Sequence, residues 1–328
     1  MITRTVTHSE GGKRLHRYLR SLLPNIPLGQ VYKMIDQGQV RVNGKRKKQD
    51  YELAAGDELT LFMEEAAFKQ GSGGPEKKPK FAGINTQIDV VHEDEELLVV
   101  NKPVGLLTHP DQTEQRDTLI TRVHAYLYKR GELDSRLFQP ATANRLDRNT
   151  SGLVLIGKTA GMLHQLNQWI QKREMSKFYV TIVEGQVKGG ATIAGALLRD
   201  ESSNVTRVVK PSSVGTGTKP TDSAHQSTGG GKSEEKAAET KYRALQVGDG
   251  YTLVEVELIS GRTHQIRTHF QSIGHPLLGD IKYGGKAVAG VNHQLLHATR
   301  IVMPDGKTFT APLPQQFRSI LRRVGISL

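Results

Sequence analysis

The sequence predicts an α+β fold divided between two domains, a small N-terminal domain and a larger one that fills most of the chain. With 328 residues, the chain has the length of about two domains. Residues 1–63 hold two helical patterns followed by strand and hairpin signals, whereas residues 84–328 mix strand patterns with helical ones. Residues 64–83 are polar and rich in Gly and Pro, so we expect a flexible linker there.

The composition points to an acidic partner. The chain has 45 Lys and Arg against 33 Asp and Glu, a formal net charge of +12, which favours a polyanion. Aromatic residues make up only 5% of the chain, which argues against a broad base-stacking surface. The chain has no cysteine, so disulfides and thiolate-bound metals are excluded. There is no apolar run of roughly 18 residues and no signal-peptide core, so we expect a soluble cytoplasmic protein with no membrane partner.

Two short helices are expected near the N-terminus. Residues 15–22 carry apolar side chains at helical spacing, with Lys and Arg mostly on the other side, and Pro24 ends this helix. Residues 28–36 predict a second helix, with Gly38 at its end.

A basic hairpin follows these helices. Residues 40–42 alternate as a strand, Asn43-Gly44 is a strong signal for a two-residue turn, and four cations follow at 45–48. A last strand is expected over residues 59–63. Two short helices followed by a basic hairpin resemble the S4 RNA-binding domain, which implies a concave positive surface for RNA phosphates. The expected RNA contacts of this domain are Lys13, Arg14, Arg17, Arg41, Lys45, Arg46 and Lys47.

The larger domain mixes short strands with a few helices. We expect strands at residues 88–92, 97–101, 153–156, 176–185, 239–243 and 251–259, and one that ends at 303. We expect helices at residues 118–130, 160–172 and 315–324. Residues 202–237 are crowded with Ser, Thr, Gly and Lys, and we expect a long flexible insertion there.

The stretch 143–156 is the centre of the larger domain. A polar cluster passes through a glycine into an unbroken apolar run, which predicts a buried strand with the polar cluster on a loop at its mouth. Arg145 and Asp147 would lean to the same side of an extended loop. Positive charge from Arg145 and Arg148 would keep the carboxylate ionised. A lone ionised carboxylate suits nucleophilic attack or base chemistry.

This stretch also carries a family resemblance. Its order Arg-Leu-Asp-x-x-Thr-Ser-Gly-Leu resembles the signature of the RluA/RluC/RluD-type pseudouridine synthases. The resemblance implies that Asp147 is the catalytic residue and that the larger domain is built on a mixed, mainly antiparallel β-sheet. The family pattern begins with His, whereas this chain has Asn144 at that position.

Further motifs extend the resemblance along the chain. Residues 98–106 resemble a second family motif, in which Lys102 either touches RNA or closes a turn. The pattern Lys-x-Tyr around Tyr179 resembles a third, whose Tyr lies in the active site against the target base. A tyrosine ring can stack on a uracil while its hydroxyl forms hydrogen bonds or transfers a proton.

The string Ser-Gly-Arg-Thr-His-Gln-Ile-Arg-Thr-His at residues 260–269 is the most diagnostic match after the Asp147 motif. The resemblance implies that Arg267 pairs with Asp147 and that Ile266 helps to wall a uracil pocket. We expect Arg262 and His264 to contact substrate RNA. His264 and His269 are five residues apart, and no carboxylate or Cys completes a ligand set, so we expect no metal.

The predicted function is the isomerisation of uridine to pseudouridine in RNA, without a cofactor and by a single aspartate acting on a flipped-out uridine. Asp147 would attack the ribose or the base, or take a ribose proton, and Arg145 would hold the vacated space or a phosphate. The N-terminal domain favours a RluC-like enzyme of large-subunit (23S) ribosomal RNA, acting as a monomer. The alternatives are a RluD-like or tRNA-directed synthase, a nucleobase glycosylase, and a non-catalytic RNA-binding or ribosome-assembly protein.

Overall fold

The structure is a computed structural model, and it describes residues 1–72, 83–133, 137–200, 205–209 and 235–327. These residues form two compact units. The first comprises Met1–Arg148 and Leu153–Glu174, and the second comprises Asn149–Gly152 and Met175–Leu328. The predicted domain boundaries at residues 63 and 84 lie inside the first unit and stay a prediction. Each unit is described by itself.

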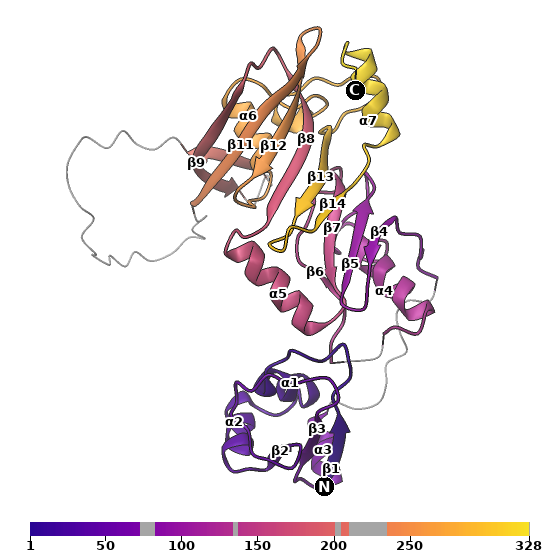
Figure 1. The fold of residues 1–328 in the computed structure, drawn as a ribbon, viewed down its shortest axis with the longest axis vertical. Coiled ribbons are helices and arrows are strands. Elements are labelled where there is room, and N and C mark those ends of the chain that lie inside the picture. The colour runs from indigo at the N-terminus through magenta and orange to yellow at the C-terminus, as the bar shows by residue number, and fades with distance from the viewer. Residues whose placement is uncertain (73–82, 134–136, 201–204, 210–234, 328) are drawn as a thin grey trace, which may run out of the picture. The chain divides into compact units, whose positions relative to one another are not determined.

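The N-terminal module, residues 1–72, contains three helices and a three-stranded sheet (Figure 1). The first two helices are α1 (Leu15–Leu22) and α2 (Leu28–Asp36), and both span the residues that the apolar spacing predicts. The antiparallel sheet has the order β1 (Ile2–Thr5), β3 (Glu58–Leu61), β2 (Val40–Val42).

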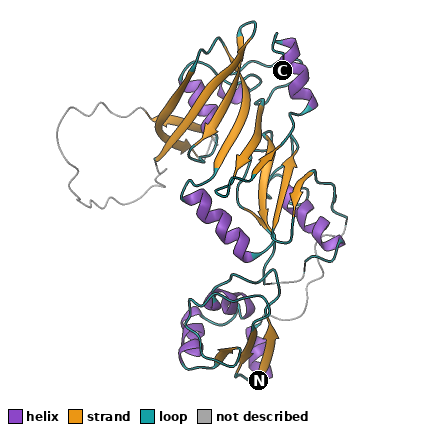
Figure 2. Ribbon diagram, in the orientation of Figure 1, coloured by secondary structure: helices purple, strands orange, loops and turns teal. Residues whose placement is uncertain are grey.

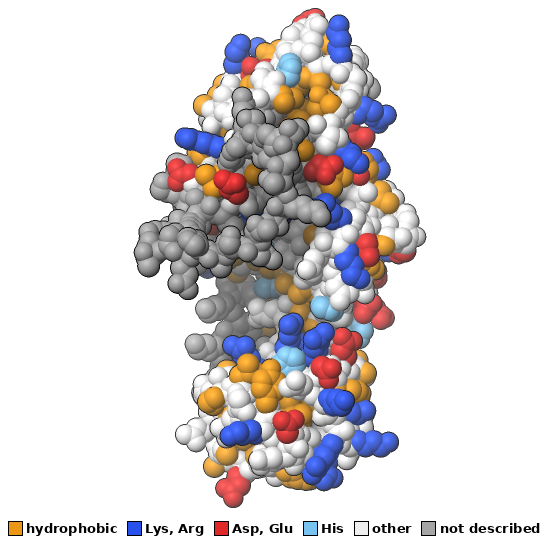
Figure 3. Space-filling model, turned by 90° about the vertical axis from the view of Figure 1, so that its left-hand side faces the viewer, with side chains coloured by type: hydrophobic (Ala, Val, Ile, Leu, Met, Phe, Trp, Pro, Cys, Tyr) orange, Lys and Arg blue, Asp and Glu red, His pale blue; other side chains and the backbone are white. Residues whose placement is uncertain are grey.

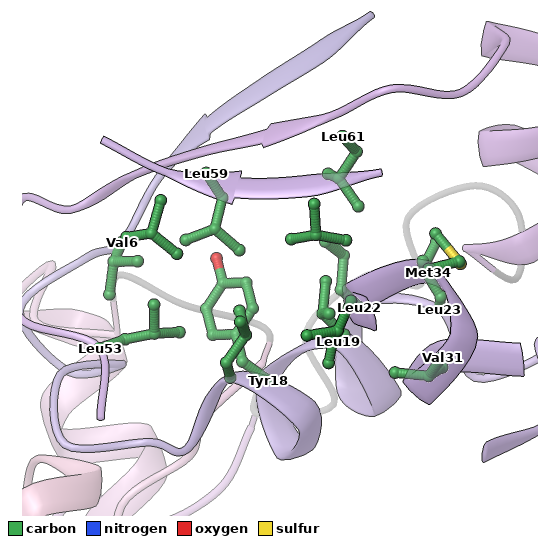
Figure 4. Close-up of a cluster of buried hydrophobic side chains, with 14 residues drawn as sticks. Val6, Tyr18, Leu19, Leu22, Leu23, Val31, Met34, Leu53, Leu59 and Leu61 are labelled. Atoms are coloured by element: carbon green, nitrogen blue, oxygen red, sulfur yellow. The ribbon is translucent and has the colours of Figure 1, made fainter. Parts of the chain in front are cut away.

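The core of this module lies between the two helices and the sheet. Figure 4 shows Tyr18 of α1 among apolar side chains that include Val6, Leu53 and Leu59. The buried Tyr18 hydroxyl is satisfied, because it donates to Glu10 (3.1 Å) and accepts from the Arg4 Nε (2.8 Å). The Tyr18 hydroxyl is therefore buried in this core with hydrogen-bond partners.

The predicted hairpin turn is confirmed, but its second arm is not a strand. Asn43 and Gly44 have positive φ angles of 50° and 71°, and Val42 and Lys45 exchange two main-chain hydrogen bonds. Residues 45–48 are consecutive cations without an apolar face, so they cannot cover the core. β2 therefore pairs with β3, and the sheet is completed by β1, which the sequence patterns missed.

The predicted flexible linker at 64–83 begins with a helix, which corrects part of that expectation. Helix α3 spans Glu65–Gly71. Phe68 packs against the core of the module, and Gly71 approaches Ile26 so closely that a Cβ there would lie 3.1 Å from its Cδ1. The packing of one aromatic side chain holds this part of the segment. Residues 73–82 lie outside the described residues.

The rest of the first unit contains a small sheet and two helices. The sheet has the order β7-β5-β4, with β4 at Val90–Glu93, β5 at Leu97–Lys102, and β6 (Ala141–Thr142) paired with β7 (Ser151–Gly157). Every residue of β7 is buried, as the unbroken apolar run predicts. Helices α4 (Leu119–Lys129) and α5 (Ala160–Gln171) confirm the two helical patterns, and threonine side chains cap both N-termini.

The second unit is a large antiparallel sheet, visible as the long strands in Figure 2. Its order is β10-β9-β11-β12-β8-β13, with β14 paired to β13, and only the first two residues of β7 pair in parallel, with β13. The strands are β8 (Ser176–Glu184), β9 (Gly190–Asp200), β10 (Val205–Val209), β11 (Lys236–Val247), β12 (Tyr251–Leu258), β13 (Leu296–Val302) and β14 (Thr308–Thr310). The predicted mixed, mainly antiparallel α+β fold is confirmed.

Helices α6 (Gln265–Ser272) and α7 (Gln315–Arg323) cover opposite faces of this sheet. Phe317 and its neighbours on α7 pack with Ile182 and Leu253, which are cross-strand partners in β8 and β12. Phe270 of α6 instead packs on Tyr242 of β11, with ring centroids 5.3 Å apart. Tyr242 pairs across the strands with Val256, and Val256 pairs with Tyr179. Because side chains alternate along a strand, these three residues point to the face opposite to that of Ile182 and Leu253. Tyr179 therefore lies on the α6 face.

The expected flexible insertion at 202–237 is wrong in part. Val205–Val209 form strand β10, which pairs with β9 in full antiparallel register, and β11 already begins at Lys236. Four of the five residues from Val205 to Val209 are β-branched, a strand signal that the polar residues on both sides obscured. Residues 201–204 and 210–234 lie outside the described residues. None of the helices in the described ranges is long and apolar enough to cross a membrane.

Candidate functional site

Asp147 lies on the loop between β6 and β7, where the sequence predicts a catalytic carboxylate. Leu146 is buried, Asp147 is half-buried and Arg145 is exposed. Leu146 packs inward next to a strand that is buried along its whole length, so the following carboxylate is presented from a rigid base.

Side chains from another segment hold the main chain on both sides of Asp147. The Thr108 hydroxyl donates to the Leu146 carbonyl (2.8 Å) and accepts from the Leu146 N–H (3.1 Å). The Arg148 carbonyl accepts from the Gly105 N–H (2.9 Å). The main chain of both residues that flank Asp147 is thus fixed by hydrogen bonds from the 105–108 segment.

Lys102 is a third attachment point for the loop. Its side chain is fully buried, and its Nζ donates to the carbonyls of Leu106 (2.7 Å), Pro103 (3.0 Å) and Arg148 (3.0 Å). Burial lowers the pKa of Lys102 to about 7, and the negative charge of Asp147 acts in the opposite direction. Of the two roles open to Lys102, the structure supports the closure of the turn.

Asn144, the departure from the family pattern, anchors the other end of the loop to β7. Its Nδ2 donates to the Leu153 carbonyl (3.2 Å), and its Oδ1 accepts from the Leu155 N–H (2.8 Å). An amide presents a donor and an acceptor on one carbon, so the side chain imitates a strand's main chain. Asn144 thus continues the pairing along the edge of β7.

The predicted arginines differ in what they contact. The Arg148 Nη2 donates to the Thr113 hydroxyl (2.6 Å) and lies 3.9 Å from Asp111, so this guanidinium reaches toward the neighbouring loop. Arg145 is exposed. The pKa of His109 is lowered mainly by burial, and the positive charge of Arg145 lowers it further. The exposed Arg145 fits a role in binding an anionic group.

In the second unit, residues that follow the Asp147 loop are tightly held. The Gln294 amide donates to the Thr150 hydroxyl (3.2 Å). His297 Nε2 donates to the Ala311 carbonyl (3.2 Å), so its Nδ1 accepts from the Ser151 hydroxyl (2.8 Å). At Gly152, whose φ is +114°, a Cβ would lie 2.2 Å from the carbonyl oxygen of Ala298, which explains the glycine.

Three predicted site residues share the α6 side of the sheet in this unit. Tyr179 of β8 is buried, with Val256 and Ala298 as its cross-strand partners. Ile266 and Arg267 lie in the first turn of α6, and both are buried. The sheet face and the helix on it therefore gather Tyr179, Ile266 and Arg267 in one unit.

Arg267 forms a bidentate ion pair that the sequence patterns missed. Its Nε and Nη2 each lie 2.7 Å from a carboxylate oxygen of Asp280, and both side chains are almost fully buried. The pairing orients the guanidinium. The signal in the sequence that could have predicted this partner is Asp280 itself, a lone acidic residue after the apolar Pro276–Gly279 segment. The predicted pair between Arg267 and Asp147 would join the two units and stays a prediction.

Tyr283, a second residue that the sequence patterns missed, supports the same helix. It lies in the short 3-10 helix η1 (Ile281–Tyr283), and its ring is stacked by Arg267 at 4.6 Å. Its hydroxyl lies 2.7 Å from the His264 Nδ1 and accepts from the Thr206 N–H (2.9 Å). His264, with a φ of 57°, thereby fixes the start of α6.

The remaining predicted residues of the 260–269 string have separate environments. Arg262 is exposed, and its Nε donates to the Ala237 carbonyl (3.4 Å). His269 is buried beside the Thr240 hydroxyl (2.9 Å from Nδ1), and burial lowers its pKa to about 4. His264 and His269 therefore face different partners, Tyr283 and Thr240.

The cations of the N-terminal module are mostly exposed, and Figure 3 shows several Lys and Arg side chains on the visible face of its surface. Lys47 lies over the Tyr51 ring at 4.3 Å. Lys13 differs from the others, because its Nζ donates to the Leu137 carbonyl and lies over the Phe138 ring. The exposed members of the predicted set are Arg14, Arg17, Arg41, Lys45 and Arg46.

Two family models match the chain. One, described as RNA pseudouridylate synthase, matches residues 96–272, which is more than half of the chain. The other, described as S4 domain, matches residues 13–59 in the N-terminal module.

Curated proteins of similar sequence span nearly the whole chain. The chain is 30% identical to the ribosomal large subunit pseudouridine synthase C of Haemophilus influenzae, over 98% of this chain and 94% of that protein. It is 30% identical to an uncharacterized RNA pseudouridine synthase of Bacillus subtilis, over 98% and 97%. Among solved structures, it resembles human RNA pseudouridylate synthase domain containing 4 with a TM-score of 0.55 and 21% identity, over 72% of this chain and 92% of that one. This last likeness is one of fold.

Proposed function

The chain belongs to the RNA pseudouridylate synthase family, and from this premise we propose that it isomerises uridine to pseudouridine in large-subunit ribosomal RNA, with Asp147 as the catalytic residue. The ribosomal substrate follows the names of relatives such as those of Haemophilus influenzae and Escherichia coli, which match over almost their whole length. The observation that carries the catalytic assignment is the loop itself, in which Leu146 and Arg148 are held by Thr108, Gly105 and Lys102 while Asp147 stays half-buried.

The chemistry asks little more than this arrangement offers. The bond between N1 of uracil and C1′ of ribose breaks, the base turns, and C5 becomes joined to C1′. The C5 proton is lost and N1 gains one, so atoms and electrons balance without an oxidant or reductant. Asp147 would attack the ribose or the base, or remove a ribose proton. The uridine must leave its stack to reach the carboxylate.

The other predicted site residues receive supporting roles. Tyr179 would stack on the detached uracil, and Ile266 would form an apolar wall beside it. Arg267, which Asp280 orients, would pair with the catalytic carboxylate. Arg145 is exposed, so it would hold a phosphate or the space that the flipped nucleotide leaves.

RNA would be bound chiefly through the cations of the N-terminal module. The net charge of +12 and the exposed Arg14, Arg17 and Lys45 fit contacts to phosphates. We further propose that Arg262 and His264 contact the RNA near the reacting uridine. The enzyme would act as a monomer in the cytoplasm, where its ribosomal substrate is found.

Replacing Asp147 by Asn tests the assignment. The substitution keeps the size of the side chain and removes its charge, so pseudouridine formation on ribosomal RNA should fall by roughly a thousandfold or more. Asp111→Asn is the matched control, because it removes an exposed carboxylate of a neighbouring loop and should retain activity. Unchanged activity in Asp147→Asn would refute the role of this aspartate.

The same assay separates the alternatives. Release of free uracil would identify a glycosylase, in which the base is not rejoined to the sugar. RNA binding by the wild-type protein without any pseudouridine would identify a non-catalytic RNA-binding protein. Mapping pseudouridines in ribosomal and transfer RNA, from cells with and without the gene, distinguishes the possible substrates.

A further inference from the structure

The N-terminal module has a pocket of about 320 Å³ beside α2, which we call the α2 pocket. We propose that the α2 pocket binds a single unpaired base of the substrate RNA, so that the module reads an extruded nucleotide in addition to the phosphates. The proposal rests on the proposed function for the identity of the polymer. The pocket is lined by Gln30, Lys33, Met34, Gln37 and Gln39.

The pocket is built on a regular helix face. Gln30 and Lys33 lie on α2, and Gln37 is its C-cap residue in helical conformation. The spacing i, i+3 and i+7 therefore puts their exposed side chains in one row. Met34 is buried and forms an apolar floor. Gln39, just before β2, completes the lining. The volume lies at the lower end of the range of roughly 300–1,000 Å³ for small-molecule sites, which suits one base better than a larger ligand.

The lining has the chemistry of base recognition. Each glutamine amide offers both a donor and an acceptor, which is what the edge of a base requires. Lys33 brings a positive charge for the attached phosphate, and none of the five lining residues is acidic. Three neutral amides around an apolar floor are poorly suited to bind a phosphate alone, because a phosphate is best held by cations and N–H donors.

Two arginines border the pocket. Gly38 lies between Gln37 and Gln39 with a φ of +75°, and a Cβ at this position would lie 2.2 Å from the Arg46 Nε. The Arg46 side chain therefore lies directly over this glycine. Arg41 lies in β2, two residues after Gln39, and its guanidinium lies over the Phe62 ring at 5.0 Å.

Phe62 supplies a stacking surface next to the amides. Its side chain is 44% exposed, which is unusual for a large aromatic residue, and its N–H donates to the Gln39 carbonyl (2.8 Å). A ring with a guanidinium on it is a common platform for an unpaired base. The edges of bases in an RNA duplex are poorly accessible in the deep groove, so the site suits an unstacked nucleotide.

Binding to hairpin RNAs tests the proposal in the full-length protein. One probe set carries a single bulged nucleotide, with each of the four bases in turn, and a matched probe carries an abasic ribose at the bulge. All probes have the same number of phosphates. Wild-type protein should bind at least one bulged probe about tenfold more tightly than the abasic probe, by fluorescence anisotropy.

Substitutions then locate the discrimination. Gln37→Ala with Gln39→Ala, and separately Phe62→Ala, should abolish the preference for the base while leaving the slope of affinity against salt unchanged. Lys33→Gln should weaken binding of all probes and lower that slope by about one unit. Gln70→Ala is the matched control, because it removes an exposed amide of α3 and should keep the preference.

Equal binding of bulged and abasic probes by the wild-type protein would overturn the proposal. So would a preference that survives in the Gln37→Ala, Gln39→Ala protein, or one that is also lost in Gln70→Ala. Pseudouridine formation on ribosomal RNA is measured on the same preparations. A wild-type protein that prefers the bulged base but forms no pseudouridine would support base binding in the α2 pocket and refute the proposed function. The failures of the two proposals are therefore distinguishable.

Discussion

Lys102 illustrates how a single buried charge can organise a loop. An ammonium group has three N–H donors, and three carbonyl oxygens receive them at 2.7–3.0 Å. One of these carbonyls belongs to Arg148, the residue after Asp147. Burial disfavours the positive charge of Lys102, whereas the carbonyls and Asp147 favour it. The stability of the folded protein therefore depends on whether Lys102 is protonated.

Stability should therefore depend on pH through Lys102. Its pKa is about 7 in the folded protein against 10.5 for the ordinary side chain, so between these values the unfolded state binds more protons. The penalty from Lys102 is complete below pH 7 and is relieved as the pH rises toward 10.5. The unfolding free energy of wild type, relative to Lys102→Met, should increase between about pH 7 and pH 10 in denaturant titrations.

Lys129→Met, which removes an exposed lysine of α4, is the control for the loss of one charge. If the unfolding free energies of wild type and Lys102→Met run parallel across this range, the buried ammonium does not control the pH dependence. Removal of the side chain also leaves three carbonyls without their donor, so Lys102→Met should be less stable than wild type at the upper end of the range.

At the scale of residues, the sequence predicted positions better than partners. The motif around Asp147 predicted a polar loop before a buried strand, and the structure has that arrangement. The partners of Arg267 could not be predicted in the same way. Asp280 and Tyr283 reach it because a tight turn and a short 3-10 helix bring them back toward α6, and neither element has a periodic pattern.

Helix α6 is held at its start by a series of polar contacts. Gln265 is buried, and its amide donates to the Glu239 carbonyl and the Thr240 hydroxyl, both at 2.9 Å. His264 adopts a left-handed conformation one residue earlier. These contacts fix the helix at the position from which Arg267 projects.

Asp280→Asn should disrupt this element. The substitution leaves the Arg267 guanidinium buried without its charge partner, and breaking a buried ion pair from one side costs about 3–5 kcal/mol. We expect a loss of that size in the free energy of unfolding, together with strongly reduced pseudouridine formation. Asp305→Asn, in an exposed turn, should change neither measurement appreciably. Wild-type stability in Asp280→Asn would contradict the importance of this pair.

Among elements, those with a strong period were predicted well. α2 was predicted to the residue, and α1 spans the apolar residues that predicted it, because each helix buries one stripe and is followed by a Pro or a Gly. β10 was missed, because its five residues are a short β-branched run within a long polar segment. β1 was missed for a different reason. Its burial depends on pairing with β3, more than fifty residues away, and a local pattern carries no information about that partner.

For RNA binding by the whole molecule, we expect the positions of the positive charges to matter more than the net charge. Arg14 and Arg17 are exposed on or beside α1, whereas Arg318 and Arg322 are exposed on α7, at the other end of the sequence. A net charge of +12 would attract RNA from any direction. Only cations that touch phosphates release counterions on binding and so contribute to the salt slope.

Two charge-matched double variants separate these effects. Arg14→Gln with Arg17→Gln should lower the slope of log affinity against log salt by about two units, because two phosphate contacts are lost. Arg318→Gln with Arg322→Gln removes the same charge and should leave the slope near its wild-type value. Equal changes in both variants, measured by RNA binding at several salt concentrations, would mean that net charge alone drives the association.

The way in which the Asp147 loop is held has a consequence for how such enzymes diversify. Thr108, Lys102 and Gly105 grip only backbone atoms of the flanking residues, so the neighbouring side chains at 145 and 148 carry none of that attachment. Under the proposed function, mutation at these two exposed positions would change contacts to RNA while the aspartate keeps its position. Specificity would then be free to change over evolutionary time around the proposed catalytic residue.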